Sequence, residues 1–213
     1  METKEQTYIQ LKEDIIYDQY SPGERLIEKH IVDELKSSRL YVREAIRRLH
    51  DEGLVEMIPN KGASVKKISL EEAVNCYGII GELEAYAAEL AILNFSDANL
   101  DELQEINNLM NKHVTKNKFM SYVKENLKFH LFLARMSNNN VLLNLISNLR
   151  NRVLKYSYSL FLIPENVHEA IKQHQDIISA CNSKDTNNLK EQIKNHVETV
   201  KEKIIKSYER RYC

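Results

Sequence analysis

The feature that most constrains the fold is the pattern that follows Ser69. From "SLEEA" onward, apolar residues recur at helical spacing in long stretches, and strand-like runs disappear. Short breaks rich in Asn, Ser, Asp and Pro, such as "NFSDANL" and "SNNN", separate the stretches. We predict helices over 69–94, 97–116, 119–137, 140–160, 165–182 and 186–209. Helices joined by such short loops indicate an antiparallel bundle.

The chain before Ser69 has a different order. Helical spacing predicts helices over 8–17, 27–35 and 39–52, and Ser37 or Ser38 can cap the third. Two strand-like runs, "LVEMI" and "ASVKKI", follow on either side of the turn sequence "PNKG". This is the order of a winged helix-turn-helix. The expected fold class is therefore mainly α, with a winged helix-turn-helix DNA-binding domain over 1–67 and an all-helical domain over 68–213.

Composition bears on the class of protein and on its cellular compartment. The net charge of -1 excludes a generally polycationic protein, but it leaves room for a local basic patch. Cys76, Cys181 and Cys213 form no CxxC motif, which indicates a reducing compartment. The start "METKEQTYIQLKEDI" lacks the apolar core of a signal peptide, and no run approaches the roughly 18 apolar residues of a membrane span. We expect a cytoplasmic protein with no membrane partner.

Positive charge is concentrated on the helix predicted over 39–52. Arg39, Arg43 and Arg47 follow one another at i, i+4 and i+8, beside an apolar stripe that faces the core. Residues near the N-terminus of such a helix reach base edges, and arginine can donate two hydrogen bonds to guanine. We expect Arg39 and Arg43 to read bases and Ser38 and Arg47 to bind phosphate.

The hairpin tip adds a second basic element. Lys61 and Gly62 give a flexible, basic wing suited to the minor groove or to phosphate. The alternative interpretation of the arginines is a solvated, salt-bridged helix face. The surrounding order of helix, turn, helix and wing favours DNA binding.

Three histidines lie on three different predicted helices of the bundle. They are His130, His174 and His196, and Asn126 lies one turn before His130. Imidazoles from separate helices can converge on a divalent metal such as Zn or Ni. The alternative is that each is an ordinary surface or hydrogen-bonded histidine.

The N-terminal residues resemble a known family. "PGERLIEKHIVDEL" and "SRLYVREAIRRLHDEGLVEMIPNKGASV" are similar to the signature of the GntR family, and the helical part resembles the FCD domain of its FadR subfamily. The resemblance implies a homodimeric bacterial transcriptional regulator, most often a repressor, whose affinity for an inverted-repeat operator changes on effector binding. It also implies DNA contacts at Lys29, Ser38, Arg39, Arg43 and Gly62.

Three positions depart from the family pattern GVSRTPVREAL. Lys36 stands in place of Gly, Leu40 in place of Thr and Tyr41 in place of Pro. Leu40 could touch a thymine methyl group where the family threonine donates a hydrogen bond. These departures bear on which operator sequence is read, not on DNA binding itself.

The FCD resemblance implies a metal site at the histidines. Its pattern of Asp and three histidines falls on Asn126, His130, His174 and His196, with a neutral amide in place of the carboxylate. We expect a weaker or differently selective divalent metal site, or an empty one.

The effector in such domains is commonly a small carboxylate. Ile80 stands where the family often carries an arginine. Carboxylate capture would then fall to the metal, or to Arg135, Arg150 or Arg152 where these face inward, and Tyr156 could line the cavity.

Two further hypotheses remain open at this point. The metal itself could be the effector of a direct metal sensor. A helical-bundle metalloenzyme is the second alternative, although the bundle offers no evident nucleophile or general base beside the histidines. We therefore expect a regulator, not an enzyme.

Overall fold

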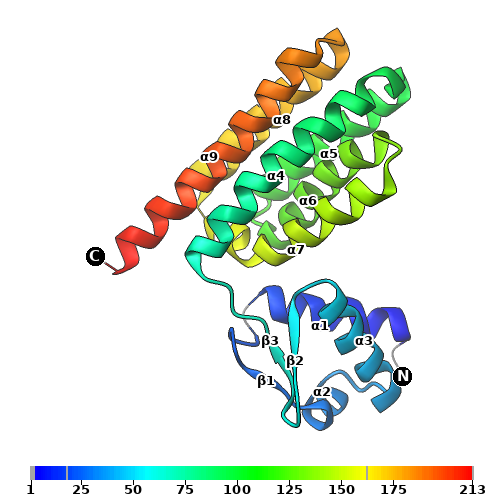
Figure 1. Cartoon of the computed structure of the whole chain (residues 1–213), viewed down its shortest axis with the longest axis vertical. Helices are drawn as coiled ribbons and strands as arrows, with labels where there is room; N and C mark the ends of the chain where they lie inside the picture. Colours follow the sequence, from blue (N-terminus) through cyan, green and yellow to red (C-terminus); the bar gives the residue numbers. More distant parts are fainter. Residues whose placement is uncertain (1–2, 18, 162, 213) are drawn as a thin grey trace. The chain divides into compact units, whose positions relative to one another are not determined.

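The computed structural model describes residues 3–17, 19–161 and 163–212 (Figure 1). Contacts divide the chain into two compact units, Met1–Ser69 and Leu70–Cys213. The first unit consists of α1 (Lys4–Ile16), β1 (Arg25–Leu26), α2 (Glu28–Glu34), α3 (Arg39–Asp51), β2 (Val55–Ile58) and β3 (Gly62–Val65). Its strands form an antiparallel sheet in the order β1-β3-β2. The expected winged helix-turn-helix is confirmed.

Helix α1 begins at Lys4, four residues before the predicted start. Thr3 Oγ1 accepts a hydrogen bond from the Gln6 amide at 3.2 Å, and the Gln6 side chain accepts one from the Thr3 amide at 2.8 Å. This reciprocal capping box satisfies amides that a helix start leaves unpaired. The first turn is polar, so apolar spacing alone could not reveal it.

Strand β1 was not predicted, because two residues are too few to show an alternating pattern. Arg25 pairs with Ser64 and Leu26 pairs with Ala63. Leu26 is also buried, so pairing and packing together hold the segment before α2 against the wing.

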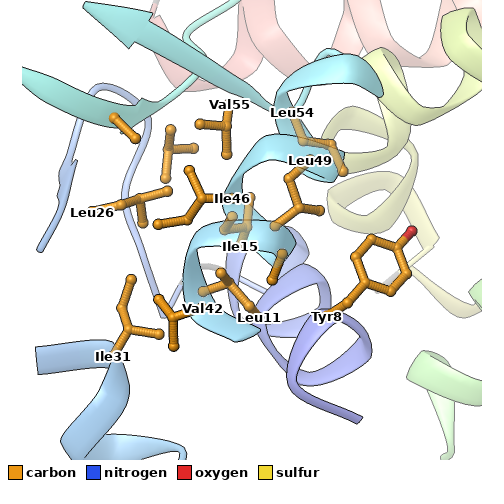
Figure 2. Close-up of a cluster of buried hydrophobic side chains, with 13 residues drawn as sticks. Tyr8, Leu11, Ile15, Leu26, Ile31, Val42, Ile46, Leu49, Leu54 and Val55 are labelled. Atoms are coloured by element: carbon orange, nitrogen blue, oxygen red, sulfur yellow. The ribbon is translucent and has the colours of Figure 1, made fainter. Parts of the chain in front are cut away.

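The core of the first unit is built on one face of α3 (Figure 2). Val42, Ile46 and Leu49 are buried there, against Leu11 and Ile15 of α1. Because these apolar residues occupy one side of α3, its arginines are left on the outer side.

The turn between α2 and α3 contains an unusual backbone conformation. Lys36 has a φ of 47°, in the left-handed region that favours glycine. A non-glycine residue there costs on the order of 1–3 kcal/mol. The resembling family carries glycine at this position, so Lys36 keeps the turn geometry without the residue best suited to it.

In the residues that the structure describes, the second unit is built of helices joined by short loops. It consists of α4 (Leu70–Ala91), η1 (Ile92–Asn94), α5 (Asp97–Thr115), α6 (Phe119–Met136), α7 (Asn140–Phe161), α8 (Pro164–Ser183) and α9 (Thr186–Tyr212). Figure 1 shows α4 running along α9, and α4 also packs against α6 and α7. The expected helical bundle, and with it a mainly α fold class, is confirmed. Within the described residues, no helix is long and apolar enough to cross a bilayer.

Candidate DNA interface and metal centre

The outer side of α3 carries the arginine strip (Arg39, Arg43 and Arg47). All three side chains are exposed, to 72% for Arg39 and 59% for Arg43. Glu28 at the start of α2 accepts a hydrogen bond from Nε of both Arg39 and Arg43, each at 2.9 Å. One carboxylate therefore holds two exposed guanidinium groups of the strip.

The N-terminus of α3 lies beside the strip. Ser38 caps the helix, and its Oγ accepts a hydrogen bond from the Tyr41 amide at 3.2 Å. The hydroxyl hydrogen of Ser38 can donate to a phosphate at this helix N-terminus, where backbone amides and the helix dipole also favour an anion. Leu40 is 65% exposed at this end, and Lys29 on α2 is exposed as well.

The wing tip combines a basic side chain with accessible backbone. Lys61 and Gly62 are both exposed where β2 turns into β3. Gly62 has a φ of 85°, and a Cβ built there would meet only ordinary contacts with Arg25. Backbone conformation, not space, is therefore what favours glycine at this position.

Arg48 is not part of the arginine strip but contacts residues of α1. Its guanidinium lies 3.5 Å from the centre of the Tyr8 ring and donates to Glu5 Oε2 at 2.9 Å. The Tyr8 hydroxyl donates to Glu52, and burial together with this bond raises the pKa of Tyr8. Arg48 therefore stabilises the contact between α1 and α3. The sequence did not reveal this cluster.

The histidine cluster (His130, His174 and His196) is the second candidate site. It joins α6, α8 and α9, and one ring nitrogen from each histidine lies within 4.8 Å of the others. The ring centres of His174 and His196 are 4.6 Å apart. All three side chains are buried. The structure therefore brings together residues that are separated by 66 positions in the sequence (130 to 196).

Two of these rings are oriented by neighbouring groups. His130 Nδ1 lies 3.1 Å from Glu84 Oε2, and His196 Nδ1 lies 2.9 Å from Gln173 Oε1. Both oxygens are acceptors, so each Nδ1 donates, and each Nε2 keeps its lone pair. This arrangement is the one by which proteins orient metal-binding histidines.

The residues present fit a divalent cation. Among the described residues, Asn126 Oδ1, His130 Nε2 and both ring nitrogens of His174 are buried without a hydrogen-bond partner. Leaving such atoms unsatisfied costs about 1–3 kcal/mol each. Burial, reinforced by repulsion between the rings, lowers the pKa of His174 and that of His196 well below the usual value. Neutral imidazoles with free lone pairs are what a metal requires.

Glu84 was not among the residues predicted from the sequence. Burial alone would raise its pKa, but Arg150 and then His130 outweigh burial and hold it well below the usual range. Arg150 donates to both carboxylate oxygens, through Nη2 at 2.7 Å and also through Nε. The signal for Glu84 lay in "ELEA" on α4, where it follows Ile80 by one turn.

The proposed effector-binding residues are in different environments. Arg150 is buried but is bound to Glu84, and Arg152 pairs with Glu72. Tyr156 is half-buried, whereas Arg135 is exposed on α6. Arg150 is linked to the histidine cluster through the carboxylate of Glu84, which also binds His130.

Comparison with known proteins covers both units. A model described as "Bacterial regulatory proteins, gntR family" matches residues 3–65, and the FCD domain matches residues 77–199. The HTH-type transcriptional repressor RspR of Escherichia coli K12 is 24% identical over 200 residues, which cover 94% of this chain and 88% of RspR. The HTH-type transcriptional regulator McbR of the same strain is 28% identical over 178 residues, covering 82% and 80%.

A solved structure shows the same fold. The structure of E. coli McbR/YncC superposes with a TM-score of 0.84 at 24% identity, covering 98% of this chain and 100% of that one. Proteins that combine these two domains are DNA-binding transcriptional regulators, not enzymes. The chain belongs to the GntR family of bacterial regulatory proteins, in the FadR subfamily that carries an FCD domain.

Proposed function

We propose that α3 of this regulator enters the major groove of its operator. Arg39 and Arg43 read bases, and Ser38, Arg47 and Lys29 bind the backbone. Lys61 and Gly62 follow the adjacent groove or backbone as the wing. The observation that carries the proposal is the exposed arginine strip on a helix whose opposite face is buried.

The test compares selective and non-selective binding. An operator duplex is selected from a random pool, and its Kd is compared with that of a scrambled duplex. Arg39→Ala or Arg43→Ala should weaken operator binding by about 1–3 kcal/mol, the size of one bidentate base contact. Lys112→Ala on α5, an exposed charge in the other unit, is the control. Unchanged discrimination in both arginine variants would contradict the proposal.

The roles of the two units and the direction of regulation are inferred from the domain organisation and from relatives. We infer that residues 1–67 bind DNA and that residues 68–213 sense the effector. RspR is named a repressor, and we infer repression for this chain as well. Because bacterial DNA lies in the cytoplasm, we infer that this DNA-binding protein acts there.

A homodimer on an inverted repeat is supported by an apolar stripe on the bundle. On α4 and η1 its exposed members recur every seven residues, with the partly buried Leu83 and Leu90 between them, and two more lie on the neighbouring α7. The exposed members are Ile79, Tyr86, Leu93, Val141 and Leu145. Ion pairs between Glu82 and Lys194 and between Glu89 and Lys190 border the α4 part. Such a heptad-like stripe can pack on its own two-fold copy.

Light scattering tests the dimer. Tyr86→Glu and Leu93→Glu place charge in the stripe, so we expect monomers at concentrations where the unchanged chain is dimeric. Asn111→Glu adds the same charge to an exposed site on α5 and should leave the dimer intact. A stripe variant that stays dimeric would contradict this interface.

We propose that His130, His174 and His196, with Asn126, hold a divalent metal such as Zn or Ni. The bound metal would act as a Lewis acid that binds the carboxylate of a small effector. Arg150, Arg152 and Tyr156 are the further candidates for effector contact, and the exposed Arg135 is the weakest of them. The unpartnered ligand atoms carry the proposal.

Elemental analysis of the purified protein and of His174→Ala tests the metal. We expect about one metal per chain in the first and a large loss in the second. Equal metal content would contradict the site. Titrating operator affinity with metal alone then separates the two modes of regulation, because an affinity change without a metabolite identifies a direct metal sensor.

A further inference from the structure

Two proposed base-reading arginines share one carboxylate on a neighbouring helix. Glu28 Oε2 accepts from Arg39 Nε at 2.9 Å, and Arg43 Nε lies 2.9 Å from Oε1 and 3.0 Å from Oε2. Burial would raise the pKa of Glu28, but its hydrogen bonds from Arg43 and Arg39 lower it. The carboxylate is therefore ionised at neutral pH and accepts from both arginines.

This arrangement leaves the terminal nitrogens of both guanidinium groups available. An arginine reads guanine by donating two hydrogen bonds to O6 and N7. With Nε occupied by Glu28, the two Nη groups remain for the base. Free, exposed arginines would lose up to about 2 kcal/mol of rotamer freedom each when they bind. Glu28 restricts that freedom before DNA arrives.

The carboxylate also changes the electrostatic attraction of the surface. Its negative charge cancels one of the two positive charges beside it. Attraction to phosphate depends on net charge and is independent of sequence, whereas the base contact depends on geometry. A carboxylate at this position therefore weakens indiscriminate binding while it orients the groups that discriminate.

We propose that Glu28 is a positioning residue that makes operator binding selective, by directing Arg39 and Arg43 toward guanine and away from phosphate. The inference rests on the base contacts proposed above for these two arginines. Helix α2 would then influence which bases are read, although Glu28 itself contacts no base.

The test is Glu28→Gln beside a matched control, Glu44→Gln. Glu44 lies on α3 and pairs with Lys4 at 2.7 Å, so its substitution removes the same charge from the same unit. Kd is measured on the selected operator and on a scrambled duplex over a range of salt. Both variants should bind the scrambled duplex more tightly. Glu28→Gln alone should also lower the ratio of selective to scrambled affinity by about tenfold, on the scale of one base contact.

A modified operator separates positioning from folding. Replacing the guanines of the operator with 7-deazaguanine removes the N7 acceptor. This replacement should weaken binding of the unchanged protein strongly and binding of Glu28→Gln much less. Equal losses would overturn the inference, as would equal selectivity of Glu28→Gln and Glu44→Gln. If Arg39→Ala and Arg43→Ala keep full selectivity, the base contacts themselves are wrong and the positioning role is overturned with them.

Discussion

Glu84 and His130 form a buried hydrogen bond, with 3.1 Å between Glu84 Oε2 and His130 Nδ1. The same carboxylate binds the guanidinium of Arg150. One side chain on α4 therefore connects α6, which carries two proposed metal ligands, with α7. Because an ionised carboxylate can only accept, this bond also fixes the His130 tautomer that presents its Nε2 lone pair to a metal.

Removing the Glu84 charge should destabilise the second unit. Glu84→Gln leaves Arg150 as a buried charge without a counter-ion, which costs about 3–5 kcal/mol. Urea unfolding of the metal-free protein measures the loss. Glu82→Gln, at an exposed carboxylate that pairs with Lys194, should cost less than about 1 kcal/mol. The double variant Glu84→Gln/Arg150→Met should recover much of the loss, and a purely additive result would contradict the coupling.

Restoring the family carboxylate should strengthen the metal site. Asn126 is buried one turn before His130 on α6, and its Oδ1 has no hydrogen-bond partner in the described residues. Asn126→Asp adds one negative charge next to a divalent cation, so we expect zinc affinity to rise by about tenfold or more. Competition with a chromophoric chelator measures it. Asn111→Asp adds the same charge on exposed α5 and should have no effect. Equal affinities in both variants would place Asn126 outside the coordination sphere.

The sequence predicted the fold because its signals are local. Helical spacing and polar breaks located the bundle helices to within a few residues, and the expected ligands His130, His174 and His196 lie together. The partners of these residues were not predictable. Glu84 reaches His130 across 46 positions and Arg150 across 66, and no local pattern encodes such a contact. Glu28 was also missed, because its role depends on how α2 crosses α3.

Acid should destabilise the metal-free protein through the buried histidines. Burial holds the pKa of His174 and of His196 well below the usual value, so the unfolded chain binds more protons than the native one below about pH 6.5. The free energy of unfolding is therefore highest above that pH. It falls as the pH drops, by up to about 1.4 kcal/mol per pH unit for each histidine. Urea unfolding in EDTA between pH 7.5 and 5.5 measures this slope. His174→Asn should reduce the slope, and an unchanged slope would contradict the assignment.

The last arginine of the strip should behave unlike the first two. Arg47 is exposed on α3, two turns beyond Arg39 and away from the capped N-terminus. We therefore expect Arg47 to contact a phosphate and not a base edge. Arg47→Ala should weaken binding to the operator and to the scrambled duplex equally, and it should reduce the slope of log Kd against log salt by about one. Arg43→Ala, which removes the same charge one turn earlier, should instead lower operator binding more than scrambled binding. If Arg47→Ala also changes the ratio of the two affinities, Arg47 reads a base, and α3 inserts more deeply into the groove than its N-terminal contacts require.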